Sequence, residues 1–322
     1  MSGRATPSCW VLTDGAAGNR RQALALAEAL TPSIREVVVE LRPPWSWVAP
    51  RLLAGGQRAL GGRDDSLLPP WPTLAIGCGR AAAWATRQLR RWSGGRTLAV
   101  QILDPRIDTR HWDLVIAPRH DGLVGPNVLT PLGSLHPIDG AWLADARAGF
   151  AGFAELPSPR LGVLIGGDMH GRPVDAAATA GFLEAVKARH AHDGGSVLAV
   201  TSRRTPADHW PMIRAAFAGV PGFVWTSSAD GANPYPGILG WADRLAVTPD
   251  SVNMLSEACA TGRPVHTHLD HALPAKLARF HAELRATRRL HDMDAITPEQ
   301  QEPLREAVAI AEKVRMHLGL GS

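Results

Sequence analysis

Arginines and hydroxyl side chains are concentrated in the segment Thr201–Pro206, directly after an apolar run. Guanidinium groups bind phosphate oxygens through paired hydrogen bonds, and a helix start adds backbone N–H donors and the positive end of a dipole. This chemistry predicts a diphosphate site formed by Ser202, Arg203, Arg204 and Thr205. A threonine helix cap beside two solvated arginines is the alternative.

Two glycine-containing turns occupy the same position in the two halves of the chain, between an apolar run and an amphipathic stretch. In the first, Thr13–Asn19, backbone N–H groups can hold an anion, so we predict binding roles for Gly15, Gly18 and Asn19. Gly166 and Gly167 form the second turn and are predicted to bind in the same way. For the first turn, the alternative is a glycine-rich turn that needs glycine for its positive φ.

Three side chains that end predicted strands could remove a proton from a substrate. His120 and Asp121 place an imidazole beside a carboxylate, and Asp14 follows the first apolar run. Each could act as a general base, so Asp14, His120 and Asp121 are the candidate catalytic residues. The turn Asp104-Pro105 lies at a similar strand end, where Asp104 could equally cap the turn.

The sequence gives little support for a metal site or for a dinucleotide-binding site. Cys9, Cys78 and Cys259 are far apart in the sequence, and no paired carboxylates have metal-ligand spacing, so no metal site is predicted. The stretch Gly77–Ala82 matches G-x-G-x-x-A, but it follows the third strand, and the next strand ends at Gln101 instead of an acidic residue. The absence of Y-x-x-x-K around the single tyrosine, Tyr235, argues against an epimerase or dehydrogenase.

Short apolar runs alternate with amphipathic stretches along the whole chain, which favours parallel sheets covered by helices. In the first half we predict strands at Cys9–Leu12, Arg35–Leu41, Leu74–Ile76, Thr97–Ile102 and Leu114–Ala117, with helices at Asn19–Leu30 and Arg80–Arg91. In the second half we predict strands at Leu161–Ile165, Val197–Thr201, Phe223–Trp225 and Leu245–Val247, with helices at Ala176–His190, Ala207–Ala218, Val252–Ala260 and Pro298–Leu318.

The fold class is therefore α/β, with two Rossmann-like domains. A length of 322 residues also favours two domains. We place them at 1–155 and 156–322, with the boundary near Phe150–Pro159, where periodicity gives way to Gly, Ala, Pro and Ser. The last helix is expected to pack back on the first domain.

The composition of the chain gives no indication of a membrane-spanning segment or of a nucleic-acid partner. Hydrophobic residues make up 45% of the chain and charged residues 20%, as in globular proteins, and no apolar run is long enough to span a bilayer. The net charge of +4 is spread along the chain, so no nucleic-acid partner is predicted. The N-terminus has no apolar signal segment, so we expect a reducing, cytoplasmic location.

The segment Ser251–Pro264 carries the pattern E-x4-G-x-P from Glu257 to Pro264. It resembles the nucleotide-sugar-binding helix of GT-B glycosyltransferases, in particular the peptidoglycan N-acetylglucosaminyltransferases. The resemblance implies that Glu257 binds the ribose hydroxyls and that Ser251 and Asn253 lie near the phosphates. It also implies that the two Rossmann-like domains face a cleft, as in the GT-B fold.

Seven short motifs resemble the mitochondrial-fission family named after the elongated-mitochondria (ELM) mutant of plants. They are D-G-x-x-G-N-x-x-Q, I-G-C-G-R, Q-I-L-D-P-R, P-x-H-D-G-L, N-V-L, T-S-R-R-T-P and D-S-V-N-M-L-S-E-A. The family is similar to GT-B enzymes, has bacterial members, and includes a plant adaptor that recruits a dynamin-related protein.

Two functions follow from these resemblances. One is a metal-independent glycosyltransferase with no permanent cofactor, which uses a nucleotide-diphosphate sugar, with UDP as the expected nucleotide. Its acceptor is not identified by the sequence, and a lipid-linked acceptor at a membrane surface is one option. The other is a non-catalytic adaptor whose outer surface binds a protein partner.

Overall fold

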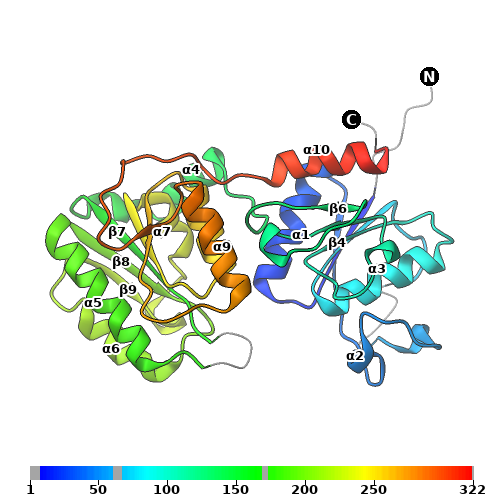
Figure 1. The fold of residues 1–322 in the computed structure, drawn as a ribbon, viewed down its shortest axis with the longest axis horizontal. Helices are drawn as coiled ribbons and strands as arrows, with labels where there is room; N and C mark the ends of the chain where they lie inside the picture. Colours follow the sequence, from blue (N-terminus) through cyan, green and yellow to red (C-terminus); the bar gives the residue numbers. More distant parts are fainter. Residues whose placement is uncertain (1–7, 61–66, 169–172, 321–322) are drawn as a thin grey trace. The chain divides into compact units, whose positions relative to one another are not determined.

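The computed structural model describes residues 8–60, 67–168 and 173–320 (Figure 1). Contacts within the chain divide it into two units. The first comprises Met1–Pro137 and Glu306–Ser322, and the second comprises Ile138–Arg305. Each unit is built around one parallel sheet, as the alternation of apolar and amphipathic stretches predicted.

The sheet of the first unit has the strand order β2-β1-β3-β4-β5-β6, and all its pairs are parallel. Its strands are β1 (Cys9–Thr13), β2 (Ile34–Val38), β3 (Leu74–Cys78), β4 (Leu98–Ile102), β5 (Leu114–Ile116) and β6 (Val128–Leu129). Its α-helices are α1 (Ala17–Leu30), α2 (Trp45–Val48), α3 (Arg80–Trp92) and α10 (Ala307–Leu318). The strand order reverses between β1 and β3, which is where open α/β sheets bind ligands.

Both faces of this sheet are buried at β1. Successive residues of this strand point to opposite faces, and each set packs in its own apolar cluster. Cys9 and Val11 pack in a cluster that includes Val314 of α10. Trp10 and Leu12 pack in another that includes Trp84 of α3. The uninterrupted apolar run of β1 is therefore the pattern of a central parallel strand.

The sheet of the second unit has the order β12-β11-β10-β7-β8-β9, again with parallel pairs. Its strands are β7 (Arg160–Ile165), β8 (Ser196–Thr201), β9 (Gly222–Trp225), β10 (Arg244–Val247), β11 (Val265–Thr267) and β12 (His291–Asp292). Its α-helices are α4 (Gly140–Gly149), α5 (Ala176–Asp193), α6 (Trp210–Ala216), α7 (Tyr235–Trp241), α8 (Val252–Ala260) and α9 (Ala275–Ala286). This is the Rossmann strand order, and it reverses between β7 and β10.

The division between the units falls at Pro137, earlier than the predicted boundary at Phe150–Pro159. The reason is α4, a helix that the sequence analysis did not predict and that packs on α7. The Phe150 ring that follows α4 lies so close to Gly237 that a Cβ there would be 2.4 Å from it. Residues 138–155 therefore belong to the second unit.

The last helix is shorter than the predicted Pro298–Leu318, because α10 begins only at Ala307. Proline lacks the N–H that a helix interior needs, so Pro303 is poorly suited to a helical turn. The residues around Pro303 instead bond to the backbone near the end of α8, where Gln301 N donates to Gly262 O at 2.8 Å. The α10 helix itself packs on α1, within the first unit (Figure 1).

The predicted helix Ala207–Ala218 is also shorter in the structure. Ala207–His209 forms a 3-10 turn, and α6 begins at Trp210 with Pro211 in its first turn. Proline is well suited to that position because the first N–H groups of a helix have no intrahelical partner.

Candidate functional site

Three loops meet at the carboxyl edge of the second sheet, where the strand order reverses. The strand β7 lies between β10 and β8, so their following loops are neighbours. These loops are Gly166–Asp168 after β7, Ser202–Pro206 after β8 and Thr248–Ser251 after β10. We refer to them together as the junction loops. The sequence analysis placed candidate residues in all three.

Hydrogen bonds lock the first and third junction loops together. Gly166 N donates to Thr248 Oγ1 at 2.7 Å, and Gly167 N donates to Asp250 Oδ2 at 3.1 Å. A Cβ on Gly166 would lie 2.1 Å from the Asp250 carboxylate, and one on Gly167 would lie 2.0 Å from Arg204 O. These two glycines therefore permit close approach of the loops, and their N–H groups are already used within them.

The second junction loop is fixed by Thr205. Its hydroxyl donates to Gly166 O, accepts from Ser202 N at 2.9 Å, and lies 3.1 Å from Ser202 Oγ. Arg204 donates from Nη1 to Asp168 O at 2.6 Å and lies 3.6 Å from Asp250. Ser202, Arg204 and Thr205 are thus structural parts of the loop.

Arg203 differs from its neighbours. Its side chain is exposed, and it makes no hydrogen bond or ion pair with any residue that the structure describes. An unengaged guanidinium beside a rigid loop is available for an anion, because the loop fixes its backbone while the side chain remains free to bind.

Helix α8 begins at the same edge. Ser251 is its N-cap, and the Ser251 hydroxyl accepts from Met254 N at 3.3 Å. Asn253 in the first turn is half-buried, and its side chain has no hydrogen bond to the described part of the chain. The first turn of a helix carries N–H groups without intrahelical partners and the positive end of the dipole, so it favours anions.

Glu257 lies further along α8 and is only 3% exposed. Its Oε2 accepts a hydrogen bond from the Tyr235 hydroxyl at 2.5 Å. Tyr235 is the first residue of α7, so this contact joins α7 to α8. The carboxylate predicted to bind ribose is therefore held by a phenol in this structure.

A buried histidine contacts the third junction loop. His281 of α9 is buried and lies 2.9 Å from Pro249 O through Nε2. Burial lowers the pKa of His281, because it disfavours the charged imidazolium. This histidine thus serves the loop as a neutral hydrogen-bonding group.

In the first unit, Asp14 and Asn19 lie at the reversal point between β1 and β3. Asn19 Nδ2 donates to both Asp14 carboxylate oxygens, at 3.0 and 3.1 Å. A Cβ on Gly79, at the start of α3, would lie 2.7 Å from the same Asn19 nitrogen. Asp14 is exposed, and Gly15 before α1 has φ +79°, a left-handed conformation that favours glycine.

Gly18 lies inside the first turn of α1. At the turn between β3 and α3, Gly77 and Gly79 allow close packing of the chain, which explains these glycines without a dinucleotide. A Cβ on Gly77 would lie 2.8 Å from the Thr86 side chain of α3. Gly79 has φ +95°. These constraints account for the G-x-G-x-x-A match.

His120 and Asp121 are separated from Asp14 by two strands, since β3 and β4 lie between β1 and β5. His120 Nε2 lies 3.7 Å from Asp121 Oδ1, and both side chains are 2% exposed. The three candidate bases therefore do not form one cluster, and Asp14 is the accessible one.

The three cysteines are buried thiols. Burial raises the pKa of Cys9 and of Cys259 to about 12, so neither is an activated nucleophile. Within residues 8–60, 67–168 and 173–320, no group of three or more His, Cys, Asp or Glu side chains is arranged to hold a metal ion. In the same residues, no helix is long and apolar enough to cross a membrane.

Three residues of the site were not predicted from the sequence: Thr248 and Asp250, which join the junction loops, and Tyr235, which holds Glu257. Asp250 directly precedes the helix cap Ser251, and an acidic residue after an apolar strand could have indicated it. No sequence signal relates Tyr235 to Glu257, because their contact depends on how α7 and α8 pack.

The two parallel sheets define a GT-B-like α/β protein, and comparison with solved structures agrees. The UDP-GlcNAc 2-epimerase of Methanocaldococcus jannaschii, solved with UDP-GlcNAc and UDP, is similar with a TM-score of 0.55 at 10% identity, over 97% of this chain and 99% of that one. A UDP-glucosyltransferase from Polygonum tinctorium has a TM-score of 0.50 at 11% identity, over 98% and 90%. At these identities the likeness shows the fold.

The sequence matches the mitochondrial fission ELM1 family over residues 17–318, and the chain belongs to this family. The Arabidopsis thaliana mitochondrial fission protein ELM1 is 32% identical over 244 residues, which is 66% of this chain. The match spans 55% of the plant protein's length. The family predicted from the seven motifs is thereby confirmed.

Proposed function

We propose that the second unit binds a nucleotide-diphosphate sugar at the junction loops and that the protein is a metal-independent glycosyltransferase. The observation that carries this proposal is the position of Arg203: an unengaged guanidinium in a loop whose other polar groups are fixed, beside loops that lead into the N-terminus of α8. The reversal point of a Rossmann sheet is also the usual ligand position.

The diphosphate would be held by Arg203, the Asn253 side chain and the N–H groups of the first turn of α8. Gly166, Gly167, Ser202, Arg204, Thr205 and Ser251 would shape the site instead of donating to the ligand, since their polar groups are used within the loops. Developing negative charge on a leaving diphosphate would be stabilised by the guanidinium and the helix dipole, which requires no metal ion.

The ribose would lie against Glu257, and Tyr235 would set the position of that carboxylate. A uridine nucleotide is the expected donor, because similar folds include the Methanocaldococcus jannaschii enzyme whose structure contains UDP-GlcNAc and UDP. On the first unit, the exposed Asp14 is the base that we propose for the acceptor hydroxyl. Asn19 would orient it through the two hydrogen bonds to its oxygens.

Calorimetry with UDP and UDP-sugars tests the donor site. Arg203→Ala and Glu257→Ala should each weaken UDP binding by ~1.5–3 kcal/mol, about 10- to 150-fold, because each removes a charged hydrogen-bonding group. Arg91→Ala, which removes an exposed arginine of the first unit, is the matched control and should leave UDP binding unchanged. Absence of binding by any nucleotide diphosphate at millimolar concentration would refute the proposal.

Tyr235→Phe separates the ribose role of Glu257 from a structural one. It removes the phenolic hydroxyl but keeps both the ring and the carboxylate, so a ribose-binding Glu257 should still bind UDP within about threefold. If Tyr235→Phe and Glu257→Ala weaken UDP equally, Glu257 acts only through its contact with α7.

The second candidate function is a non-catalytic adaptor at the cytoplasmic surface of a membrane. It is favoured by membership of a mitochondrial-fission family and by the burial of His120 and Asp121, which removes two of the three candidate bases from solvent. Asp14→Asn distinguishes the functions: a transferase should lose ~10²–10⁴-fold in rate while still binding UDP. An adaptor would show no transfer in either form.

A further inference from the structure

A separate cavity of about 470 Å³ opens in the first unit, and the proposed function does not use it. It is lined by Arg51, Leu52, Arg87, Arg106, Asp108 and His111, among others. Three arginines with one carboxylate give the lining an excess of positive charge. Its volume is within the range of small-molecule sites.

The single carboxylate of the cavity is already compensated. Asp108 lies 2.7 Å from Arg110 Nε, and its Oδ1 accepts from Arg110 N at 3.0 Å. These hydrogen bonds hold the pKa of Asp108 below its ordinary value. The lining arginines therefore have no acidic partner of their own in the cavity.

Two of the arginines are unengaged. The side chains of Arg51 and Arg106 are exposed, and their guanidinium groups make no hydrogen bond or ion pair with the residues in the described ranges. Unpaired arginines on a surface are ordinary, but these two line the same cavity as a third, Arg87. Like charges that converge without counter-charge repel each other, so an anion between them is favoured.

Arg87 forms a fixed wall of the cavity. Its Nη1 donates to Pro50 O at 2.5 Å, and its guanidinium lies 5.6 Å from the centre of the Trp112 ring. Burial lowers the pKa of Arg87, because the charge is partly desolvated. A desolvated cation gains more from an anion than a hydrated one does.

The backbone that carries Arg106 is strained. Arg106 has φ +57°, and Leu103 in the same turn has φ +73°, both in the left-handed region that non-glycine residues rarely occupy. Asp104 Oδ1 holds the turn by accepting from Arg106 N at 2.7 Å. The motif Q-I-L-D-P-R thus builds a strained turn that places an arginine at the cavity, and such strain is typical of ligand sites.

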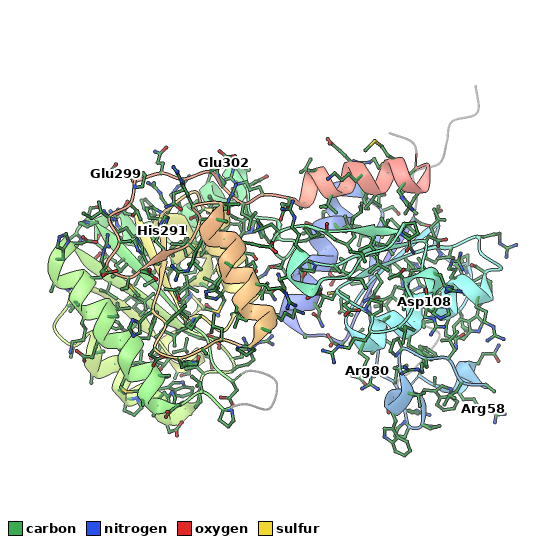
Figure 2. All side chains as sticks on the ribbon, in the orientation of Figure 1. Arg58, Arg80, Asp108, His291, Glu299 and Glu302 are labelled. Atoms are coloured by element: carbon green, nitrogen blue, oxygen red, sulfur yellow. The ribbon has the colours of Figure 1, made fainter. Side chains whose placement is uncertain are left out.

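We propose that this cavity, which we name the arginine pocket (Arg51, Arg87, Arg106 and His111), binds a phosphoryl anion. The planar guanidinium fork suits the oxygens of a phosphate or pyrophosphate group. That group could be free or could belong to a lipid headgroup. Figure 2 labels Asp108, which lines this pocket, and Arg80 at the start of α3, which donates to Ala49 O.

The test compares two charge-matched double variants. Arg51→Gln/Arg106→Gln removes the two unengaged pocket arginines, and Arg91→Gln/Arg96→Gln removes two exposed arginines outside the pocket. Both are made in the full chain carrying Arg203→Ala, so that pyrophosphate binding at the junction loops does not obscure the result. The probes are inorganic pyrophosphate by calorimetry and phosphatidylcholine vesicles containing phosphatidic acid by sedimentation.

The pocket variant should weaken pyrophosphate binding, vesicle binding or both by about 10-fold or more, whereas the control should stay within about twofold. Loss for pyrophosphate alone identifies a free anion, and loss for vesicles identifies a lipid headgroup. Equal losses in both variants, or no binding of either probe, would overturn the proposal. When Arg203 is left in place, the pocket variant and the control variant should bind UDP with the same affinity. The outcome of this test is therefore independent of the donor-site proposal.

Discussion

Removing the Asp250 carboxylate should destabilise the second unit, because it joins two of the three junction loops. Its side chain is 9% exposed, accepts from Gly167 N at 3.1 Å and accepts from Thr248 Oγ1 at 2.6 Å. At ~1.5 kcal/mol for each hydrogen bond to a charged group, Asp250→Ala should lower the free energy of unfolding by ~3 kcal/mol. The ion pair with Arg204 adds little, since that side chain is 45% exposed.

Urea unfolding followed by circular dichroism measures this change. Asp250→Asn keeps the shape of the side chain but has one oxygen in place of two, so it should lose about half as much free energy of unfolding as Asp250→Ala. Asp208→Ala, at an exposed aspartate, is the matched control and should stay within ~0.5 kcal/mol of the unsubstituted protein. A loss below ~1 kcal/mol for Asp250→Ala would refute the role assigned to this carboxylate.

Two further predictions concern stability. Gly79→Ala should lower the free energy of unfolding by ~1–3 kcal/mol, because residue 79 has φ +95° and the new Cβ would lie 2.7 Å from Asn19 Nδ2. Gly94→Ala, with φ +65° but open space around it, should lose less in the same urea assay, and equal losses would contradict the close-contact argument. Burial lowers the pKa of His266 from 6.5 to about 4, so the unfolded chain takes up the proton first and stability should fall as pH drops from 6.5 towards 4, by up to ~3 kcal/mol. His266→Gln should reduce this pH dependence, and an unchanged slope would show that other groups cause it.

Much of the fold follows from local sequence patterns. Apolar runs predicted β1, β3, β4, β7, β8 and β10 to within one or two residues at each end, because strands buried on both faces are apolar throughout. Helix α8 was predicted with the bounds it has, since Ser251 caps it and Gly262 follows its end.

The missed features depend on tertiary contacts. Helix α4 contains six glycines or alanines but two large apolar residues, Trp142 and Leu143, so its apolar pattern is weak. Its packing on α7 joins it to the second unit. The segment 298–306 has helical spacing, but Pro303 and the backbone hydrogen bonds to Cys259 at the end of α8 and to Gly262 after it keep it from forming a helix. The division at Pro137 follows from α4 and could not be read from composition.

The candidate site shows the same limit. Sequence motifs located all three junction loops, because polar residues after buried strands mark the ligand edge of a parallel sheet. They could not separate Arg203, which is unengaged, from Arg204, which is bound to Asp168 O. Which of two adjacent arginines faces a ligand depends on loop conformation rather than on residue type.

A crystal structure with UDP bound would show whether the junction loops and α8 form the donor site. The diphosphate should lie beside Arg203 and the first turn of α8, with the ribose hydroxyls on Glu257 and with the junction loops in the conformation described above. Density for UDP at any other position, or a diphosphate that contacts neither Arg203 nor α8, would contradict this prediction.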